Sequence, residues 1–382
     1  MPENLPAEIL ALREQAKRLL EEELTSMEPT LGPDTSIPIP PETAEWTRAR
    51  SREAGLFTLS QPKELGGDDA GALTLTVLRE TLAASNLRLA RLVLGPDPGV
   101  LRHAGGELVE SHLQPVLRGE KKGAFAFTEP RDAPHPTSAT PQGEDLLVHG
   151  TKAYVTGGDE ADFFLTLVRV KAEGDSAGGT AMLVIDKDTP GVHVHERFQS
   201  LDGSHHVSLH FHDARVPRAR IIGEVGEGMP RALRNIGSVR LALSAQASGM
   251  CLFVLEQTAQ SLQLPHRSGT PLAERESVRL RYADMRIEAT AARSLLYRTA
   301  RLADTGANTV NETIATKVFT TEVLGRVVDM AMQLEGGQAL VAGHPLETLY
   351  RRARAMRLTE GANDLLRLQL ARGKLELGKG TI

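Results

Sequence analysis

The residues with the clearest chemical potential lie near the end of the chain, in the segment Thr359-Glu360-Gly361-Ala362-Asn363-Asp364, between two stretches of helical texture. A glutamate before a glycine at such a junction has two interpretations. It can cap the N-terminus of the second helix and have no chemical role. It can also be a carboxylate on a turn that faces a pocket, where burial raises its pKa toward the range of a general base. Spacing alone favours the cap.

Histidines indicate a second kind of chemistry, a metal site. Such a site needs three or four ligands that converge on one point, and no cysteine or acidic residue stands near these histidines at a recognisable spacing. On a strand, three of them would share one face. We therefore predict a solvated strand face and no metal centre. The histidines concerned are His193, His195, His205, His206, His210 and His212.

The single cysteine, Cys251, excludes an internal disulfide and a cysteine-rich metal site, and it fits a reducing cytoplasm. It lies in an apolar stretch, so we predict a small core residue and no nucleophile. Nucleotide-binding loops also lack support, because no GxGxxG follows a strand and no Walker lysine loop occurs. The glycine-rich segment 223–228 is acidic, and we interpret it as a connection between a strand and a helix.

Length and charge narrow the class of protein. The chain has 382 residues, enough for two or three packed units, and a formal net charge of −5. An acidic chain is a poor non-specific ligand for nucleic acid or for an anionic membrane. No signal-peptide pattern stands at the N-terminus. The most apolar run, 241–255, contains Ser244, Gln246 and Ser248, so we predict a buried core helix that does not span a membrane.

The spacing of apolar residues changes twice along the chain, from helical to strand-like and back to helical. The elements that position Glu360 must come from these three segments. Apolar residues in 1–122 recur at helical spacing, with helices expected at 43–54 and 72–89. Short apolar runs separated by turn clusters fill 123–226, and Val207, Leu209 and Phe211 alternate with polar residues as in a half-buried strand. We predict an antiparallel β-barrel or sandwich there.

Helical spacing returns in 227–382. Apolar residues at 283, 287, 291 and 295 recur at steps of four. Thr309-Val310-Asn311-Glu312 is a capping-box pattern that opens a further helix. Helices, then strands, then helices indicate segregated α+β layers. We predict an N-terminal helical domain (1–122), a central β-domain (123–226) and a C-terminal four-helix-bundle domain (227–382).

Six short segments, in this order along the chain, resemble motifs of the acyl-CoA dehydrogenase family. The resemblance runs from about residue 8 to 375. One loop, Gly95 to Gly99, is further similar to the branch found as the C-terminal part of kinase-fused acyl-CoA dehydrogenases. The six segments are 54–67 ("GL…P.E.GG"), 126–130 ("TEP"), 150–156 ("G.K.(W/Y/F).T"), 211–217 ("F..v.VP"), 333–337 ("Q..GG") and 354–367 ("EG(T)..I.R").

The resemblance implies FAD bound between the β-domain and the C-terminal helices, often across a subunit boundary of a homodimer or homotetramer. Arg267 matches an arginine that reaches the FAD pyrophosphate of a neighbouring subunit. Gln333, Gly336 and Gly337 match the turn against the adenosine half, and Asp364 matches a flavin contact after the "EG" turn. The positions that match the lining of the flavin ring are Phe125, Phe127, Thr128, Tyr154 and Thr156.

The implied reaction is the α,β-dehydrogenation of an acyl-CoA thioester, as in fatty acid metabolism, with electrons passed to an electron-transfer flavoprotein. Glu360 matches the base that takes the α-proton, while the β-hydrogen leaves as hydride to flavin N5. A polarised thioester carbonyl is needed, since the α-proton is otherwise too weak an acid. Arg240 matches an arginine on the CoA side of the substrate.

The chain departs from the family pattern at several places. After "TEP" the family usually continues with a "GAGSD"-like turn, whereas this chain has Arg131-Asp132-Ala133-Pro134-His135-Pro136. Prolines in place of glycines imply a different loop on the thioester-binding side. The "R..FG" element is shortened to Arg267-Ser268-Gly269 and lacks its aromatic residue. Three other family residues also differ: a glutamine is replaced by Glu276, the threonine after "EG" by Ala362, and the acidic residue three positions before Arg240 by Gly237.

Two alternatives keep the fold and change the function. One is an oxidase or monooxygenase that uses oxygen; the relatives of that kind often have another residue at the base position, which Glu360 disfavours. The other is a non-catalytic flavin scaffold that binds DNA or another protein. The net charge of −5 and the lack of a long basic extension disfavour it.

Overall fold

The computed structural model describes residues 4–31, 37–174 and 177–378. By its contacts the chain forms two compact units that are discontinuous in sequence. The helical unit comprises Met1–Ser60, Asp69–Leu94 and Gly237–Ile382, and the β unit comprises Gln61–Asp68 and Gly95–Ile236. The mixed α+β class is as predicted. The predicted domain boundaries at residues 122 and 226 follow the order of elements along the chain and stay a prediction.

The first part of the helical unit contains α1 (Ala7–Arg18), a π-helical turn (Leu19–Leu24), α2 (Thr25–Met27), α3 (Pro41–Glu53) and α4 (Ala72–Ala84). Helix α4 starts after Gly71, which has no side chain to cap the first amides. The amides of Ala72 and Leu73 instead donate to the carboxylate of Asp304, at 2.5 and 3.0 Å. A side chain from far along the sequence thus supplies the N-cap of α4.

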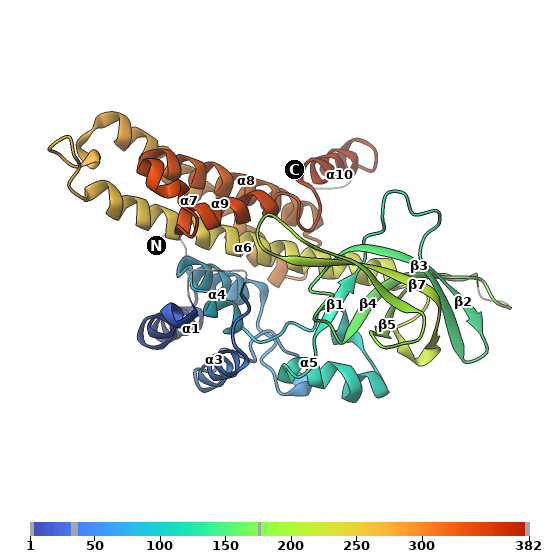
Figure 1. Ribbon diagram of the computed structural model, residues 1–382. Helices are drawn as coiled ribbons and strands as arrows, with labels where there is room; N and C mark the ends of the chain where they lie inside the picture. The colour runs from blue at the N-terminus through green and yellow to red at the C-terminus, as the bar shows by residue number, and fades with distance from the viewer. Residues whose placement is uncertain (1–3, 32–36, 175–176, 379–382) are drawn as a thin grey trace. The chain divides into compact units, whose positions relative to one another are not determined.

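The second part of the helical unit is a bundle of long helices (Figure 1). Helices α6 (Gly228–Gln263, in this unit from residue 237), α7 (Glu276–Asp304), α8 (Val310–Glu335) and α9 (Pro345–Met356) share one core, and α10 (Asn363–Leu375) packs on α8. Cys251 is buried in that core, as predicted, and burial raises the pKa of its thiol. By length and apolar composition α6 could span a membrane, yet 44% of its most apolar window is buried inside the protein.

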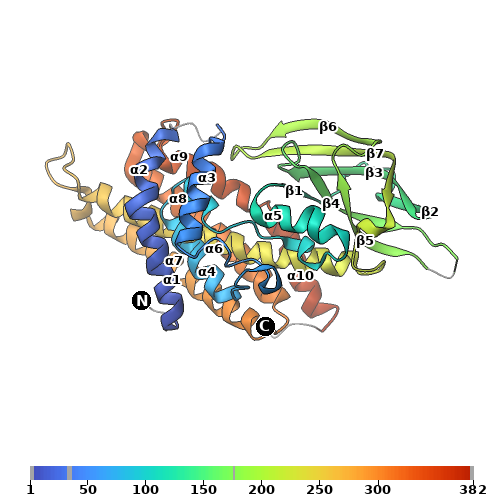
Figure 2. The same cartoon turned by 90° about the horizontal axis from the view of Figure 1, so that it is seen from below.

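The β unit is built on one sheet of eight strands among the described residues, in the order β6-β7-β3-β2-β4-β5-β8 with β1 beside β4 (Figure 2). The inner faces of β3 and β7 share a core with β4 and β5. The opposite face of β4 and β5 packs on α5 (Gln114–Arg118), so β4 is buried on both faces. The strands are β1 (Gly123–Ala126), β2 (Ser138–Gln142), β3 (Asp145–Thr156), β4 (Phe163–Val170), β5 (Gly179–Asp186), β6 (Val192–Gln199), β7 (His205–Pro217) and β8 (Ile221–Ile222).

The prediction of a wholly antiparallel sheet is wrong in one respect. Strands β1 and β2 both pair with β4 in parallel, while the other pairs are antiparallel. Parallel neighbours need long connections, and here the chain between β1 and β4 is long enough to include β2 and β3. The alternation of Val207, Leu209 and Phe211 is confirmed, since all three side chains are fully buried.

The structure adds two details to the helical prediction. The residues at steps of four in α7 lie on its exposed side, with Ile287 65% exposed, whereas Met285 and Ala289 face the core. Helix α8 begins where the capping-box pattern predicts, but the Thr309 side chain forms no cap hydrogen bond. The amide of Val310 donates to the carboxamide oxygen of Asn308 instead, at 3.2 Å.

Candidate active site

Glu360 lies on the turn that joins α9 to α10 in the helical unit. Its φ angle is +57° and that of Gly361 is +101°, so two consecutive residues adopt left-handed backbone conformations. Ala362 occupies the N-cap position of α10, and no side chain caps that helix. The cap interpretation of Glu360 is therefore wrong, because its carboxylate does not cap α10.

The carbonyl oxygens of this turn are held by two cations from different helices. Arg240 of α6 donates from Nε to the carbonyl oxygen of Glu360 at 2.9 Å. Lys317 of α8 donates from Nζ to the carbonyl oxygen of Gly361, also at 2.9 Å. A Cβ at Gly361 would lie 3.3 Å from an Arg240 nitrogen, so glycine also suits the close packing here. The turn is fixed from two sides.

A buried polar network continues from Lys317 into α10. Lys317 Nζ also donates to Oδ1 of Asn363 at 2.8 Å. The other end of that amide, Nδ2, donates to Thr321 Oγ1 at 3.1 Å and to Glu322 Oε1 at 3.3 Å. Arg367 of α10 then pairs with Glu322 at 2.7 Å. Each polar group in this chain of contacts has a partner, as buried polar groups require.

Electrostatics around Glu360 favour a proton-accepting role. Burial raises the pKa of its carboxyl, and the positive charges of Arg240 and Lys317 partly oppose that rise. Burial, with repulsion from Arg240, lowers the pKa of the Lys317 ammonium to about 8. Burial also lowers the pKa of Arg240. A half-buried carboxylate with a raised pKa on a fixed turn is suited to general-base catalysis.

The sequence prediction missed Lys317 and Asn363, which the structure brings to the base. One signal could have found the lysine. It stands three residues after Ile314 and one before Val318, on the buried face of α8, and its side chain is fully buried. A charged residue on an apolar helix face needs a buried partner. Asp364, which was predicted instead, is exposed in the first turn of α10 and contacts Arg367.

The residues predicted to line a flavin ring lie together in the β unit. Phe125 and Phe127 stack with ring centroids 5.8 Å apart. Thr128 is joined to β3 by a hydrogen bond from the amide of Ala153 to its carbonyl oxygen, at 2.9 Å. Tyr154 of β3 sits at an irregularity of the β3–β7 ladder, with φ +55° and 66% exposure. Such irregularities redirect side chains.

The segment before the altered loop is held by an ion pair between a buried lysine and a half-buried glutamate. Lys152 of β3 donates to Glu129 Oε1 at 2.9 Å and to the carbonyl oxygen of Phe127 at 3.2 Å. The amide of Thr137 donates to the same carboxylate oxygen at 2.8 Å. Glu129 and Thr137 therefore tie together the two ends of the loop Arg131 to Pro136, which differs from the family pattern.

Other predicted cofactor residues lie at the far end of the helical bundle. Arg267 is exposed on the connection between α6 and α7, and Gln333, Gly336 and Gly337 are at the C-terminal end of α8. The turn of Glu360 is bonded to Arg240 in the first half of α6 and to Lys317 in the first half of α8. With a rise of about 1.5 Å per residue, the two ends of α8 are about 38 Å apart. The structure does not bring these residues to Glu360 within one chain.

The histidines form rows on the outer face of β3, β6 and β7. His195 and His210 stack with centroids 4.1 Å apart, and burial lowers the pKa of His210. His206 contacts Thr156 at 3.1 Å. Within the ranges described above, no three His, Cys, Asp or Glu side chains are arranged to hold a metal ion.

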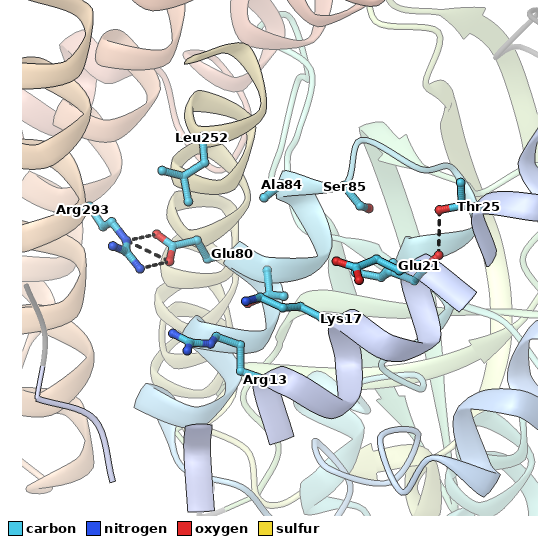
Figure 3. Close-up of a pocket in the computed structure, with 11 residues that line it drawn as sticks. Arg13, Lys17, Glu21, Thr25, Glu80, Ala84, Ser85, Leu252 and Arg293 are labelled. Atoms are coloured by element: carbon cyan, nitrogen blue, oxygen red, sulfur yellow. Dashed lines mark hydrogen bonds and ion pairs between the residues drawn. The ribbon is translucent and has the colours of Figure 1, made fainter. Parts of the chain in front are cut away.

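A separate pocket of about 500 Å³ lies among α1, α4, α6 and α7 (Figure 3). Arg13 and Lys17 line one side, and Glu80 with Arg293 lines another. Leu252, which lines it from α6, is twelve residues beyond Arg240, or about 18 Å along the helix. The pocket is therefore remote from the carboxylate of Glu360.

The side chains of the β unit fit a flavin. FAD presents a flat ring with polar edges and hydroxyl groups, and the β unit offers an exposed aromatic, Tyr154, and the hydroxyl of Thr156 on β3, to which Thr128 is joined through the amide of Ala153. The bulge at Tyr154 holds that ring outward in a strained conformation, which indicates a functional position. These residues could hold the isoalloxazine, while Arg267 and Gly336–Gly337 could hold the adenosine half of an FAD bound to a second copy of the chain.

Known proteins resemble the chain over most of its length. An acyl-CoA dehydrogenase of Bacillus subtilis (strain 168) is 28% identical over 329 residues, which are 83% of this chain and 86% of that protein. A cyclohexane-1-carbonyl-CoA dehydrogenase of Geobacter metallireducens is 29% identical over 332 residues, 84% and 86% of the two chains. The solved butyryl-CoA dehydrogenase of Megasphaera elsdenii shares the fold, with a TM-score of 0.83 at 23% identity over 98% of this chain and 100% of that one.

Family models give the same result. The model for the acyl-CoA dehydrogenase middle domain matches residues 124–214, and the model for the acyl-CoA dehydrogenase C-terminal domain matches residues 226–375. The two matches follow the family's order and together cover more than half of the sequence. The chain belongs to the acyl-CoA dehydrogenase family of FAD-dependent oxidoreductases.

Proposed function

We propose that this protein oxidises an acyl-CoA thioester to the α,β-unsaturated product, with Glu360 as the base that removes the α-proton. The observation that carries the proposal is the setting of Glu360. Its carboxyl has a pKa raised by burial, it caps no helix, and its turn is tied to Arg240 and Lys317.

The chain's own residues supply position and proton transfer. The carboxylate of Glu360 takes the α-proton, and a fixed turn keeps it in one geometry relative to the α-carbon. Arg240, beside it, adds positive charge near the CoA side of the substrate. The chemistry that FAD supplies when bound is the acceptance of a hydride from the β-carbon at N5. Phe125, Tyr154 and Thr156 would hold that ring in the β unit.

The relatives guide the choice of compounds for a substrate panel. Proteins that match this chain include the short-chain specific acyl-CoA dehydrogenase of rat, 27% identical over 84% of this chain, and the cyclohexane-1-carbonyl-CoA dehydrogenase named above. We therefore place short linear, short branched and alicyclic acyl-CoAs first in a test panel. The rebuilt loop between Glu129 and Thr137 is the place where this chain would differ from them in thioester binding.

We extend the proposal to the protein's partners. An electron-transfer flavoprotein would take the electrons, and the active form would be a homodimer or homotetramer in the cytoplasm. Arg267 and Gly336–Gly337 support the oligomer, because they lie at the end of the bundle opposite Glu360 and would serve the FAD of a second copy.

The test is spectroscopic. Purified protein should be yellow, and its flavin absorbance should bleach anaerobically with at least one acyl-CoA of the panel. A colourless protein that FAD cannot reconstitute would defeat the proposal. Rapid reoxidation by oxygen in the presence of product would instead favour the oxygen-using alternative.

A further inference from the structure

A fully buried lysine stands beside the proposed base. Lys317 has no exposed surface, although a buried ammonium group is costly unless it is well paired. An apolar residue of similar length would pack on α8 without that cost. The charge therefore has a use that packing does not explain.

The contacts of Lys317 show where it acts. Its Nζ lies 2.9 Å from the carbonyl oxygen of Gly361 and 2.8 Å from Oδ1 of Asn363. Both acceptors belong to the segment that directly follows Glu360. The Asn363 amide is oriented from its other end by Thr321 and Glu322, so its oxygen is fixed toward the ammonium.

The second tie to this turn comes from another helix. Arg240 holds the carbonyl of Glu360, and Lys317 holds the next carbonyl along the chain. Two consecutive peptide units are thus attached to α6 and to α8. These contacts maintain the left-handed conformations at Glu360 and Gly361. If the peptide units rotated, these conformations would change and the Glu360 carboxylate would move.

We propose that Lys317 is a positioning residue for Glu360: its buried ammonium attaches the turn to α8, fixes the carboxylate in its reactive geometry and adds a positive charge beside it. This inference rests on the proposed function, in which Glu360 is the base. Lys317 itself touches neither substrate nor cofactor in the proposal.

The charge has a predictable sign of effect. The charged groups that face Glu360 are Arg240 from α6 and Lys317 from α8, and Glu322 of α8 acts on Lys317. A positive neighbour lowers the pKa of a carboxyl. Removal of the Lys317 charge should therefore raise the pKa of Glu360 and move the acidic limb of the pH–rate profile to higher pH.

The experiment compares Lys317→Met with Thr316→Val in the FAD-bound protein. Thr316 is the preceding residue of α8, equally buried, and its hydroxyl pairs with Thr299, away from the turn. Each variant removes one buried polar group from the same helix. If Lys317→Met gives no soluble protein, Lys317→Gln, which keeps a donor without the charge, takes its place.

Two readouts are measured. The first is hydrogen–deuterium exchange of the segment 357–363, which needs no activity. The second is the pH dependence of anaerobic flavin bleaching with an acyl-CoA. We expect faster exchange in Lys317→Met, a maximal bleaching rate roughly 10- to 100-fold lower, as small misplacements produce, and an acidic limb at higher pH. Thr316→Val should match wild type in exchange rate, maximal bleaching rate and position of the acidic limb.

The outcomes separate the two claims. Wild-type exchange, maximal rate and acidic limb in Lys317→Met would overturn the positioning role. Equal losses in Thr316→Val would overturn it as well, since they would reflect general loosening of α8. If the wild-type protein bleaches with no acyl-CoA, the proposed function fails, and the exchange data still decide whether Lys317 holds the turn.

Discussion

Arg240 and Glu360 are 120 positions apart in the sequence, yet Nε of the arginine lies 2.9 Å from the carbonyl oxygen of the glutamate. The contact joins the first half of α6 to the turn before α10. Arg240 therefore holds the turn that carries the base, in addition to its predicted contact with the CoA side of the substrate. The first prediction separates these roles.

Substitution of Arg240 should impair the reaction in two ways. Arg240→Met removes a charge-assisted hydrogen bond, worth about 1.5–3 kcal/mol, which corresponds to a fall in the bleaching rate of roughly 10- to 100-fold. It should also move the acidic limb to higher pH, because Arg240 lowers the pKa of Glu360. Arg240→Lys should restore the limb and only part of the rate. A loss confined to substrate affinity would show that the contact with the turn is dispensable.

Replacement of the base is the second prediction. Glu360→Gln should fold and bind FAD but bleach about 10²- to 10⁴-fold more slowly with acyl-CoA, the usual contribution of a general base. Anaerobic stopped-flow absorbance measures the rate. Glu376→Gln, an exposed carboxylate paired with Arg372, serves as the control and should behave as wild type. Bleaching at the wild-type rate in Glu360→Gln would mean that another group takes the proton.

The third prediction concerns stability against pH. The pKa of Lys317 is about 8 in the folded protein, below the ordinary value of 10.5. Between these values the unfolded chain binds more protons than the folded one, so this group makes the free energy of unfolding rise with pH. Urea unfolding of wild type and Lys317→Met at pH 7.5, 9 and 10 tests it. The stability difference should change in favour of wild type as pH rises, and a constant difference would contradict the lowered pKa of the buried lysine.

A fourth prediction addresses the polar core beside the pocket. The buried carboxylate of Glu80 accepts hydrogen bonds from Ser248 at 2.6 Å, from Tyr297 at 2.5 Å and from Arg293 at 2.9 Å. Glu80→Gln removes the charge that compensates Arg293 and should lower the free energy of unfolding by about 3–5 kcal/mol. Tyr297→Phe should lower it by about 1–3 kcal/mol.

The matched control for that network is an exposed pair. Arg326 and Glu288 are bonded at 2.9 Å on the surface of α8 and α7. Arg326→Gln should change the free energy of unfolding by about 1 kcal/mol or less. Denaturant titration of the variants gives the comparison. If Glu80→Gln and Arg326→Gln lower the free energy of unfolding equally, the buried network stabilises the protein no more than a surface ion pair does.

The fifth prediction uses two glycines of α6. A Cβ at Gly249 would lie 2.2 Å from the carbonyl oxygen of Glu80, whereas one at Gly237 would meet nothing within 4 Å. Gly249→Ala should therefore force α4 away from α6 and destabilise the protein by about 1–3 kcal/mol. Gly237→Ala should stabilise it by about 0.4–1 kcal/mol, since alanine favours the helix. Thermal unfolding distinguishes the signs, and equal shifts would refute the close contact of the helices.

The sequence predicts the classes of the elements well, because helical spacing and strand alternation are local properties. The faces of the helices are harder. In α7 the residues at steps of four include the exposed Ile287, while the buried stripe begins at Met285. Both stripes are apolar, and only the packing of α6 and α8 decides which one is covered. The parallel pairing of β1 with β4 likewise depends on where distant strands meet.

The candidate site divides in the same way. Glu360 could be found because a short motif contains it, and the order of the motifs along the chain identified the family. The contacts that hold its turn could not be predicted, since Arg240 and Lys317 come from 120 and 43 positions earlier in the sequence. The apolar neighbours Ile314 and Val318 indicate that Lys317 is on a buried face, but its partners in the turn follow only from the fold.

The left-handed backbone at Glu360 has a consequence for how this protein can change over evolutionary time. Among residues with a side chain, asparagine and aspartate tolerate that conformation best, and glycine adopts it freely. The turn is attached through the main-chain oxygens of residues 360 and 361, which every residue type possesses. Mutation to asparagine or glycine at this position would thus leave the scaffold folded while removing the base. Stability exerts no selection for the carboxylate, so only use of the reaction can preserve it.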